Sequence, residues 1–150
     1  MVMEEMEVSK KSIEALYGIK KNKVNLTRVK TKTKKWLEVF PNPKPGRDYT
    51  VEIEFPEFTC RCPRTGHPDF ALITIKYTPG KFCVELKALK YYLNSFRDEG
   101  HFHEEVTNLI FKDLMLALAP TSLVVEGNFN VRGGTHPIIT VGDTQLFQEV

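Results

Sequence analysis

The segment 58–70 holds the residues best suited to covalent chemistry. Cys62 lies in a turn-rich stretch between two predicted strands, with Arg61 and Arg64 close by and Asp69 seven residues further on. Neighbouring cations favour the thiolate form of a cysteine, and the thiolate is the nucleophile. The segment therefore predicts a catalytic Cys62, although a free cysteine can also serve as a small buried hydrophobic residue.

Soft metal ligands are present in the same region. The candidates are Cys60, Cys62, His67, His101 and His103. Structural zinc sites usually pair their cysteines as Cys-x-x-Cys, whereas the spacing here is Cys-x-Cys. Zinc binding stays open as an alternative, but we expect the chemistry to need no metal.

Two further polar clusters fall on predicted helices. Lys87 and Lys90 are three residues apart, so they share a helix face and could bind phosphates. An ordinary solvated face is the alternative. Phe102, His103 and Glu104 stand where the next helix begins, and they could stack on a flat heterocycle and accept its N–H groups. A carboxylate in the first turn also favours the helix dipole, so this cluster alone does not decide its role.

Hydrophobic periodicity indicates the elements that position these clusters. Apolar–polar alternation and β-branched residues predict strands, and apolar residues three and four apart predict helices. The strands are 51–55, 70–77, 123–131 and 136–141, with 82–85 as a short continuation of the second, and the helical stripes are 89–96 and 106–117. Gly100 and Pro120 end the helices.

The order of these elements is strand, strand, helix, helix, strand, strand, or ββααββ. Tight turns between neighbouring strands imply an α+β fold with a four-stranded antiparallel sheet and two helices on one face. The open edges of such a sheet must be protected, which favours a homo-oligomer. The prolines in 40–46 predict a rigid connector, with the compact core beginning near Tyr49.

The basic residues gather at the N-terminus. Residues 1–35 hold ten Lys or Arg against four Glu, whereas the rest of the chain is acidic. We therefore expect a basic N-terminal arm over 1–35 and a catalytic domain over 36–150. The arm is interpreted as a solvated extension or a subunit contact, and nucleic-acid binding is the alternative.

Three features suggest the compartment. The longest apolar run, 114–119, is too short for a membrane span, which takes about 20 residues. The first residues do not have the pattern of a secretory signal. The odd number of cysteines, three, argues against a disulfide framework. We therefore expect a cytoplasmic protein without a membrane partner.

Three motifs, in this order, resemble the 7-cyano-7-deazaguanine reductases. Residues 62–70 match Cys-Pro-x-Thr-Gly-x-Pro-Asp-Phe, residues 85–92 match the family's Glu-x-Lys-x-x-Lys-x-aromatic pattern, and residues 102–104 match Phe-His-Glu. Residues 40–43 and 132–134 are also similar to family landmarks. The resemblance spans roughly 36–137 and indicates the short, single-module branch.

The resemblance implies a tunnelling fold that assembles into oligomeric barrels, as pentameric rings or a decamer, with active sites between subunits. It implies reduction of the nitrile of 7-cyano-7-deazaguanine to 7-aminomethyl-7-deazaguanine, for queuosine modification of tRNA, without direct tRNA binding. Nitrile to amine is a four-electron change, so two NADPH are needed. No Gly-x-Gly-x-x-Gly fingerprint is present, so NADPH should bind outside a Rossmann unit.

The same resemblance implies roles for individual residues. Cys62 would form a thioimidate with the nitrile, and Asp69 would protonate its nitrogen. The expected substrate-binding residues are Val84, Glu85, Leu86, Phe102, His103 and Glu104. The expected NADPH-phosphate residues are Lys87, Lys90 and Arg132. Cys60 stands where relatives usually have serine, so it is a second candidate thiol.

Three other functions stay open at this level. An amidinotransferase would use the same cysteine adduct on a nitrile already in tRNA, without NADPH. A non-enzymatic RNA-binding module would use residues 10–35, with affinity that falls steeply with salt. A cyclohydrolase-like enzyme on the same fold would need zinc.

Overall fold

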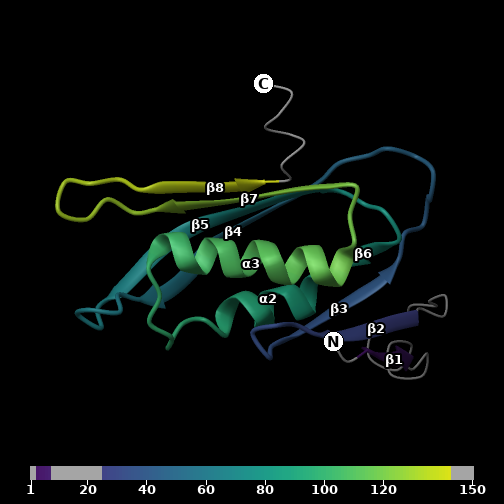
Figure 1. Cartoon of the computed structure of the whole chain (residues 1–150), viewed down its shortest axis with the longest axis horizontal. Coiled ribbons are helices and arrows are strands. Elements are labelled where there is room, and N and C mark those ends of the chain that lie inside the picture. Colours follow the sequence, from purple (N-terminus) through teal and green to yellow (C-terminus); the bar gives the residue numbers. More distant parts are fainter. Residues whose placement is uncertain (1–2, 8–24, 143–150) are drawn as a thin grey trace, which may run out of the picture.

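The computed structural model describes residues 3–7 and 25–142 (Figure 1). In chain order, the elements are β1 (Met3–Glu7), β2 (Asn25–Lys30), β3 (Trp36–Pro41), β4 (Val51–Arg61), β5 (Pro68–Thr78), β6 (Phe82–Val84), α2 (Leu86–Asn94), α3 (His103–Leu118), β7 (Ser122–Phe129) and β8 (Ile138–Gly142). The two helices lie between two sheets, so the described part of the chain forms three layers (Figure 1).

The larger sheet has the strand order β4-β5-β7-β8, and all its pairs are antiparallel. Its strands alternate as half-buried strands do, and Ile73 and Ile75 of β5 and Val125 of β7 are fully buried. The predicted α+β class, the antiparallel four-stranded sheet and the helices on one of its faces are confirmed.

The smaller sheet corrects two expectations. Its order is β1-β2-β3-β6, and β6 pairs with β3 instead of continuing β5. The expectation for 82–85 was wrong because local sequence does not reveal which strand a three-residue segment pairs with. The core also begins well before Tyr49, since Leu37 and Val39 of β3 are fully buried.

Part of the predicted N-terminal arm lies in this sheet. β2 pairs antiparallel with β1 and β3, and its Leu26 and Val29 are buried. The turn between β2 and β3 contacts the helical layer, where the Thr33 hydroxyl donates to the buried Asp113 carboxylate at 2.7 Å. Residues 8–24, which carry much of the basic charge, lie outside the described residues.

Both helices have the expected buried stripes. In α2 the buried residues are Leu89, Tyr92 and Leu93, and Phe96 just after it is fully buried. In α3 the buried apolar residues are Val106, Ile110, Leu114, Ala117 and Leu118. α3 ends at Leu118; the next residue, Ala119, has a left-handed backbone (φ 45°), and Pro120 follows it. None of the described helices is long and apolar enough to span a membrane.

Candidate active site

The loop 62–67 joins β4 to β5 and presents Cys62. The Cys62 N–H donates to the His67 carbonyl at 2.8 Å, and the Gly66 N–H donates to the Cys62 carbonyl at 2.9 Å. Gly66 has a left-handed backbone (φ 74°), which glycine adopts without strain. The Arg61 side chain also donates to the Gly66 carbonyl at 3.1 Å. The loop is therefore closed on itself and fixes the direction of the Cys62 side chain.

Hydrogen bonds within this loop favour the Cys62 thiolate. These hydrogen bonds, and one from the Arg132 side chain outside the loop, lower the pKa of Cys62 to about 7 although burial opposes this. The largest contribution comes from the Thr65 side chain, followed by the backbone of Thr65 and Arg64. A substantial fraction of the half-buried Cys62 is then thiolate at neutral pH.

The second candidate thiol is in the opposite situation. Cys60 is fully buried, and burial, together with the negative charges of Asp69, Cys62 and Glu99, raises the pKa of Cys60 to about 12. A buried neutral thiol is a packing residue and a poor nucleophile. Of these two thiols, Cys62 therefore has the lower pKa and the greater exposure to solvent.

Asp69 begins β5 beside this loop and is largely buried. Its two carboxylate oxygens have different partners: Oδ1 accepts from Arg132 Nη1 at 2.6 Å, and Oδ2 lies 3.3 Å from His103 Nε2. The His103 ring is itself fixed, because it stacks on Phe129 with ring centroids 3.9 Å apart and planes within 13°. Through these two contacts, the Asp69 side chain links the turn between β7 and β8 to the start of α3.

A cavity of about 260 Å³ brings these residues together. Its lining includes six of the predicted site residues: Cys62, Asp69, Phe102, His103, Glu104 and Arg132. They come from the β4–β5 loop, β5, the start of α3 and the turn after β7, which are far apart in the sequence. Phe102 is 55% exposed, so a flat ligand can reach its ring.

The predicted residues 84–86 lie in a different cavity of about 560 Å³. Aromatic residues line it with them, including Phe40, Tyr49 and Tyr77, and none of its lining residues within the described chain also lines the Cys62 cavity. The Val84 N–H donates to the Tyr77 hydroxyl at 3.0 Å. The two halves of the predicted substrate site are thus separate in one copy of the chain.

Glu85 also has a structural role. Its carboxylate caps α2 and accepts from the backbone N–H groups of Lys87 at 3.0 Å and Ala88 at 2.7 Å. Lys87 and Lys90 are exposed on α2 and line neither cavity. Arg132, the third predicted phosphate-binding residue, lies with Asp69 instead, so one copy of the chain does not gather the three cations.

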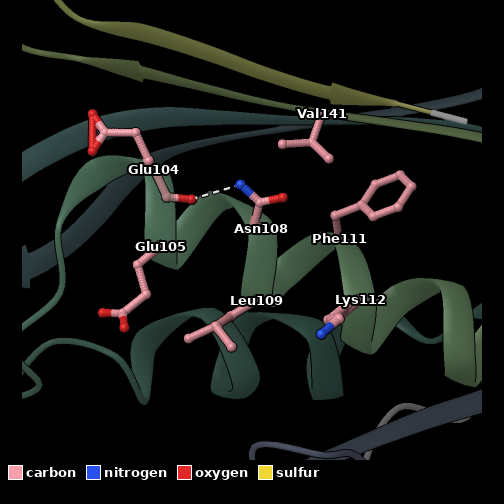
Figure 2. Close-up of a pocket in the computed structure, with 7 residues that line it drawn as sticks. All are labelled: Glu104, Glu105, Asn108, Leu109, Phe111, Lys112 and Val141. Carbon is pink, nitrogen blue, oxygen red and sulfur yellow. Dashed lines mark hydrogen bonds between the residues drawn. The ribbon is translucent and has the colours of Figure 1, made fainter. Parts of the chain in front are cut away.

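A third cavity, of about 540 Å³, lies between α3 and β8 (Figure 2). Glu104 lines both this cavity and the Cys62 cavity. Figure 2 shows the side chains of Glu104 and Glu105 pointing away from one another, and Asn108 donating to the Glu104 carbonyl at 2.8 Å. The first turn of α3 thus presents its two carboxylates to different surroundings.

Sequence reasoning missed the role of Thr65 and the bridge of Glu99, His101 and Glu105, since it considered His101 only as a candidate metal ligand. The Thr65 contact with Cys62 depends on loop closure, although Thr65 belongs to the Pro-x-Thr-Gly motif. His101 and Glu105 are four residues apart, a spacing that places side chains together at a helix start. Within the described residues, no group of three or more His, Cys, Asp or Glu side chains could hold a metal ion.

Comparison with known proteins identifies the family. A family model described as QueF-like protein matches residues 68–146. A protein of Thermomicrobium roseum is 58% identical over 110 residues, which cover 73% of this chain and 86% of the relative. One of Anaeromyxobacter dehalogenans is 61% identical over 104 residues, which cover 69% and 85%. Both are named NADPH-dependent 7-cyano-7-deazaguanine reductase.

The chain belongs to the 7-cyano-7-deazaguanine reductase family. The resemblance stated from its motifs is therefore confirmed. A solved structure of the archaeosine synthase QueF-Like, in the apo form, is similar with a TM-score of 0.58 and covers 67% of this chain and 96% of that protein. At 16% identity this likeness shows the shared fold, which is the tunnelling fold expected of the reductase family.

Proposed function

We propose that this protein reduces the nitrile of 7-cyano-7-deazaguanine to the primary amine, 7-aminomethyl-7-deazaguanine, with two NADPH per turnover. The reaction would supply queuosine modification of tRNA in the cytoplasm. The names of the relatives support the substrate and the use of NADPH. The observation that carries the chemistry is a Cys62 with a pKa of about 7 in one cavity with the buried Asp69.

The first step forms a covalent thioimidate. The Cys62 thiolate adds to the nitrile carbon while the nitrile nitrogen takes a proton from Asp69, so a C–S bond forms and the C≡N bond becomes C=N–H. His103 Nε2, 3.3 Å from Asp69 Oδ2, offers a route by which a proton reaches that carboxyl. A nitrile is a weak electrophile in water, and the covalent adduct divides its reduction into easier steps.

The later steps consume four electrons. A hydride adds to the thioimidate carbon and a proton to its nitrogen, which leaves a C–N single bond with sulfur still attached. The nitrogen lone pair then expels the Cys62 thiolate, and the resulting protonated imine takes a second hydride to give the amine. NADPH would supply each hydride, so the reduction of one nitrile would consume two molecules of NADPH.

Substrate recognition would need two copies of the chain. Phe102, His103 and Glu104 surround Cys62, and we propose that they stack on the deazaguanine and accept its N–H groups. Residues 84–86 line the separate cavity, so they would act on substrate held by a neighbouring copy. We therefore propose a homo-oligomer, as pentameric rings or a decamer, with active sites between subunits.

The cations of the described chain fit the phosphates of NADPH in part. Lys87 and Lys90 are exposed one turn apart on α2, a geometry suited to phosphate oxygens. Arg132 is 52% exposed and pairs with Asp69, so it would reach NADPH from the Cys62 side. We propose that these three residues bind NADPH across the same subunit boundary.

The division of the chain remains a proposal as well. We propose that residues 36–150 carry catalysis and that the basic residues in 1–35 serve subunit contact or solubility rather than tRNA binding. Removing residues 1–24 should then leave the reductase reaction intact. If the truncated protein stays folded but loses the reaction, the N-terminal segment belongs to the catalytic unit.

The test is the stoichiometry of NADPH oxidation. Purified protein mixed with a limiting amount of free 7-cyano-7-deazaguanine should oxidise two NADPH per nitrile, followed by absorbance, and release the amine, followed by mass spectrometry. Activity confined to nitrile-bearing tRNA, without loss of NADPH, would instead identify an amidinotransferase.

A further inference from the structure

His101 occupies an unusual position beside the proposed active site. It lies in the connection between α2 and α3, and its side chain is 15% exposed. Each ring nitrogen contacts a carboxylate: Nδ1 is 2.6 Å from Glu105 Oε1, and Nε2 is 2.8 Å from Glu99 Oε1. His101 also lines the Cys62 cavity.

This geometry specifies the charge of the ring. An ionised carboxylate only accepts hydrogen bonds, and a neutral imidazole has a single N–H donor. Two carboxylate partners therefore require both nitrogens to be protonated, which makes His101 an imidazolium. Burial opposes this charge, but the hydrogen bonds to Glu99 and Glu105 outweigh it and raise the pKa of His101 above its ordinary value.

The charges around His101 hold the carboxylates in their ionised form. Lys35, from the turn between β2 and β3, pairs with Glu99 and approaches the face of Phe96, whose ring also meets the His101 ring. Burial would raise the pKa of Glu99, yet its hydrogen bonds to Lys35 and His101 lower it. From β4, the Arg61 guanidinium faces Asp98 at 3.2 Å, and the neutral thiol of Cys60 lies near Glu99.

The cavity side presents a second set of charged groups. These are Cys62, Arg64, Asp69, His103, Glu104 and Arg132, of which Asp69 pairs with Arg132 and His103. The side-chain partners of His101 are thus Glu99 and Glu105, whereas Asp69 has its partners within the cavity. The His101 charge therefore acts first on the connection and the start of α3.

Backbone contacts join this cluster to the proposed nucleophile. The His101 N–H donates to the Arg61 carbonyl at 3.0 Å, and the Arg61 N–H donates to the Glu99 carbonyl at 2.9 Å. Arg61 directly precedes Cys62, and His101 directly precedes Phe102. Gly100 packs so closely that an added Cβ would lie 3.3 Å from Pro63 Cα. The connection and the Cys62 loop are therefore held together at one point.

We propose that His101 is a positioning residue, which as an imidazolium bridging Glu99 and Glu105 holds the substrate-recognition residues 102–104 against the Cys62 loop. The expected effect on catalysis rests on the proposed function above. Loss of the ring proton removes one of the two bridging hydrogen bonds and leaves a carboxylate facing a lone pair. The segment 102–104 then loses its fixed position, while the hydrogen bonds that stabilise the Cys62 thiolate remain.

The kinetic test uses His101→Gln and His101→Arg. The neutral glutamine should raise KM for the nitrile substrate at neutral pH, by up to about a hundredfold, and its KM should no longer rise at alkaline pH as that of the wild type does. Arginine keeps the charge and can donate to both carboxylates, so it should restore KM and keep it constant into the alkaline range. His136→Gln is the matched control, since His136 is exposed and contacts the Asn128 side chain.

Two outcomes would overturn the proposal. A wild-type KM in His101→Gln, with the same rise of KM at alkaline pH, would show that the bridge has no positioning role. A defect in His101→Arg equal to that of His101→Gln would show that the charge is irrelevant.

Hydrogen exchange in the wild type gives a test that does not depend on activity or on the folding of a variant. Amides of residues 101–106 should exchange faster, after correction for intrinsic rates, at about pH 9 than at about pH 6. Equal protection at both pH values would contradict the proposal. Should the nitrile prove not to be a substrate, this exchange difference would still test the bridge, so the two proposals can fail separately.

Discussion

Thr65 is the residue on which the acidity of Cys62 depends most. Its side chain gives the largest contribution to the lowered Cys62 pKa, and its hydroxyl also accepts from the His67 N–H at 3.2 Å. Thr65→Val removes the hydroxyl and keeps the shape. We predict that the Cys62 pKa rises from about 7 toward the ordinary value of 9.0, so less thiolate is present at neutral pH.

The measurement is the rate of Cys62 alkylation by iodoacetamide as a function of pH. Thr121→Val serves as a control, because Thr121 is exposed and lies in the loop before β7. An alkylation midpoint that stays near 7 in Thr65→Val would mean that backbone donors alone stabilise the thiolate.

At this scale the sequence was informative where a motif was continuous. The stretch 62–70 carries both Cys62 and Asp69, and 102–104 carries the residues around them. The contacts of Thr65, and the bridge of Glu99, His101 and Glu105, depend on how the chain closes in space. The local sequence around Glu85 did not indicate that its carboxylate would cap a helix while the residue also lines a cavity.

At the scale of elements, the N-terminus of α2 depends on Glu85. Its carboxylate satisfies two backbone N–H groups that the helix leaves unpaired. We predict that Glu85→Ala lowers the free energy of unfolding by about 0.5–2 kcal/mol, the usual range for a lost cap. Denaturant unfolding checks this, with Glu57→Ala at an exposed position of β4 as the control.

Glu85→Asp separates capping from the proposed substrate contact. Aspartate is a good cap, so stability should stay near wild type, whereas the shorter side chain should raise KM for the nitrile. A full loss of stability in Glu85→Asp would instead mean that the longer side chain is needed for capping.

The elements differed in how well their sequence predicted them. Alternation in β4 and β5 and the helical stripes of α2 and α3 are local patterns, and they predicted the right kind of element. The predicted strand 51–55 was too short, because β4 continues to Arg61 past an irregularity in its pairing between Phe55 and Phe58. β3 has only six residues and its end overlaps the proline-rich stretch 40–46, so the apolar residues Leu37 and Val39 formed too short a pattern to predict a buried strand. The pairing of β6 with β3 joins segments about forty residues apart, which local pattern does not report.

At the scale of the whole molecule, the main feature is that the Cys62 cavity is separate from the cavity lined by residues 84–86. If a working site combines the Cys62 cavity of one copy with residues 84–86 of another, two inactive variants should complement each other. Co-expressed Cys62→Ala and Glu85→Lys subunits should recover roughly a quarter of wild-type activity, since a random neighbour pair is intact that often.

Each variant expressed alone gives the baseline for this experiment, and light scattering gives the size of the assembly. Mixed assemblies with no activity above the two baselines would place the complete site within a single copy. A monomeric wild type with full activity would contradict the proposed assembly directly.

The central claim is that Cys62 forms a covalent adduct with the nitrile, and intact-protein mass tests it most directly. The protein is mixed with 7-cyano-7-deazaguanine in the absence of NADPH. Wild type and Cys60→Ala should both gain one substrate mass, because the buried Cys60 thiol takes no part, and Cys62→Ala should gain none. An adduct on Cys62→Ala, or no adduct on folded wild type, would contradict the account.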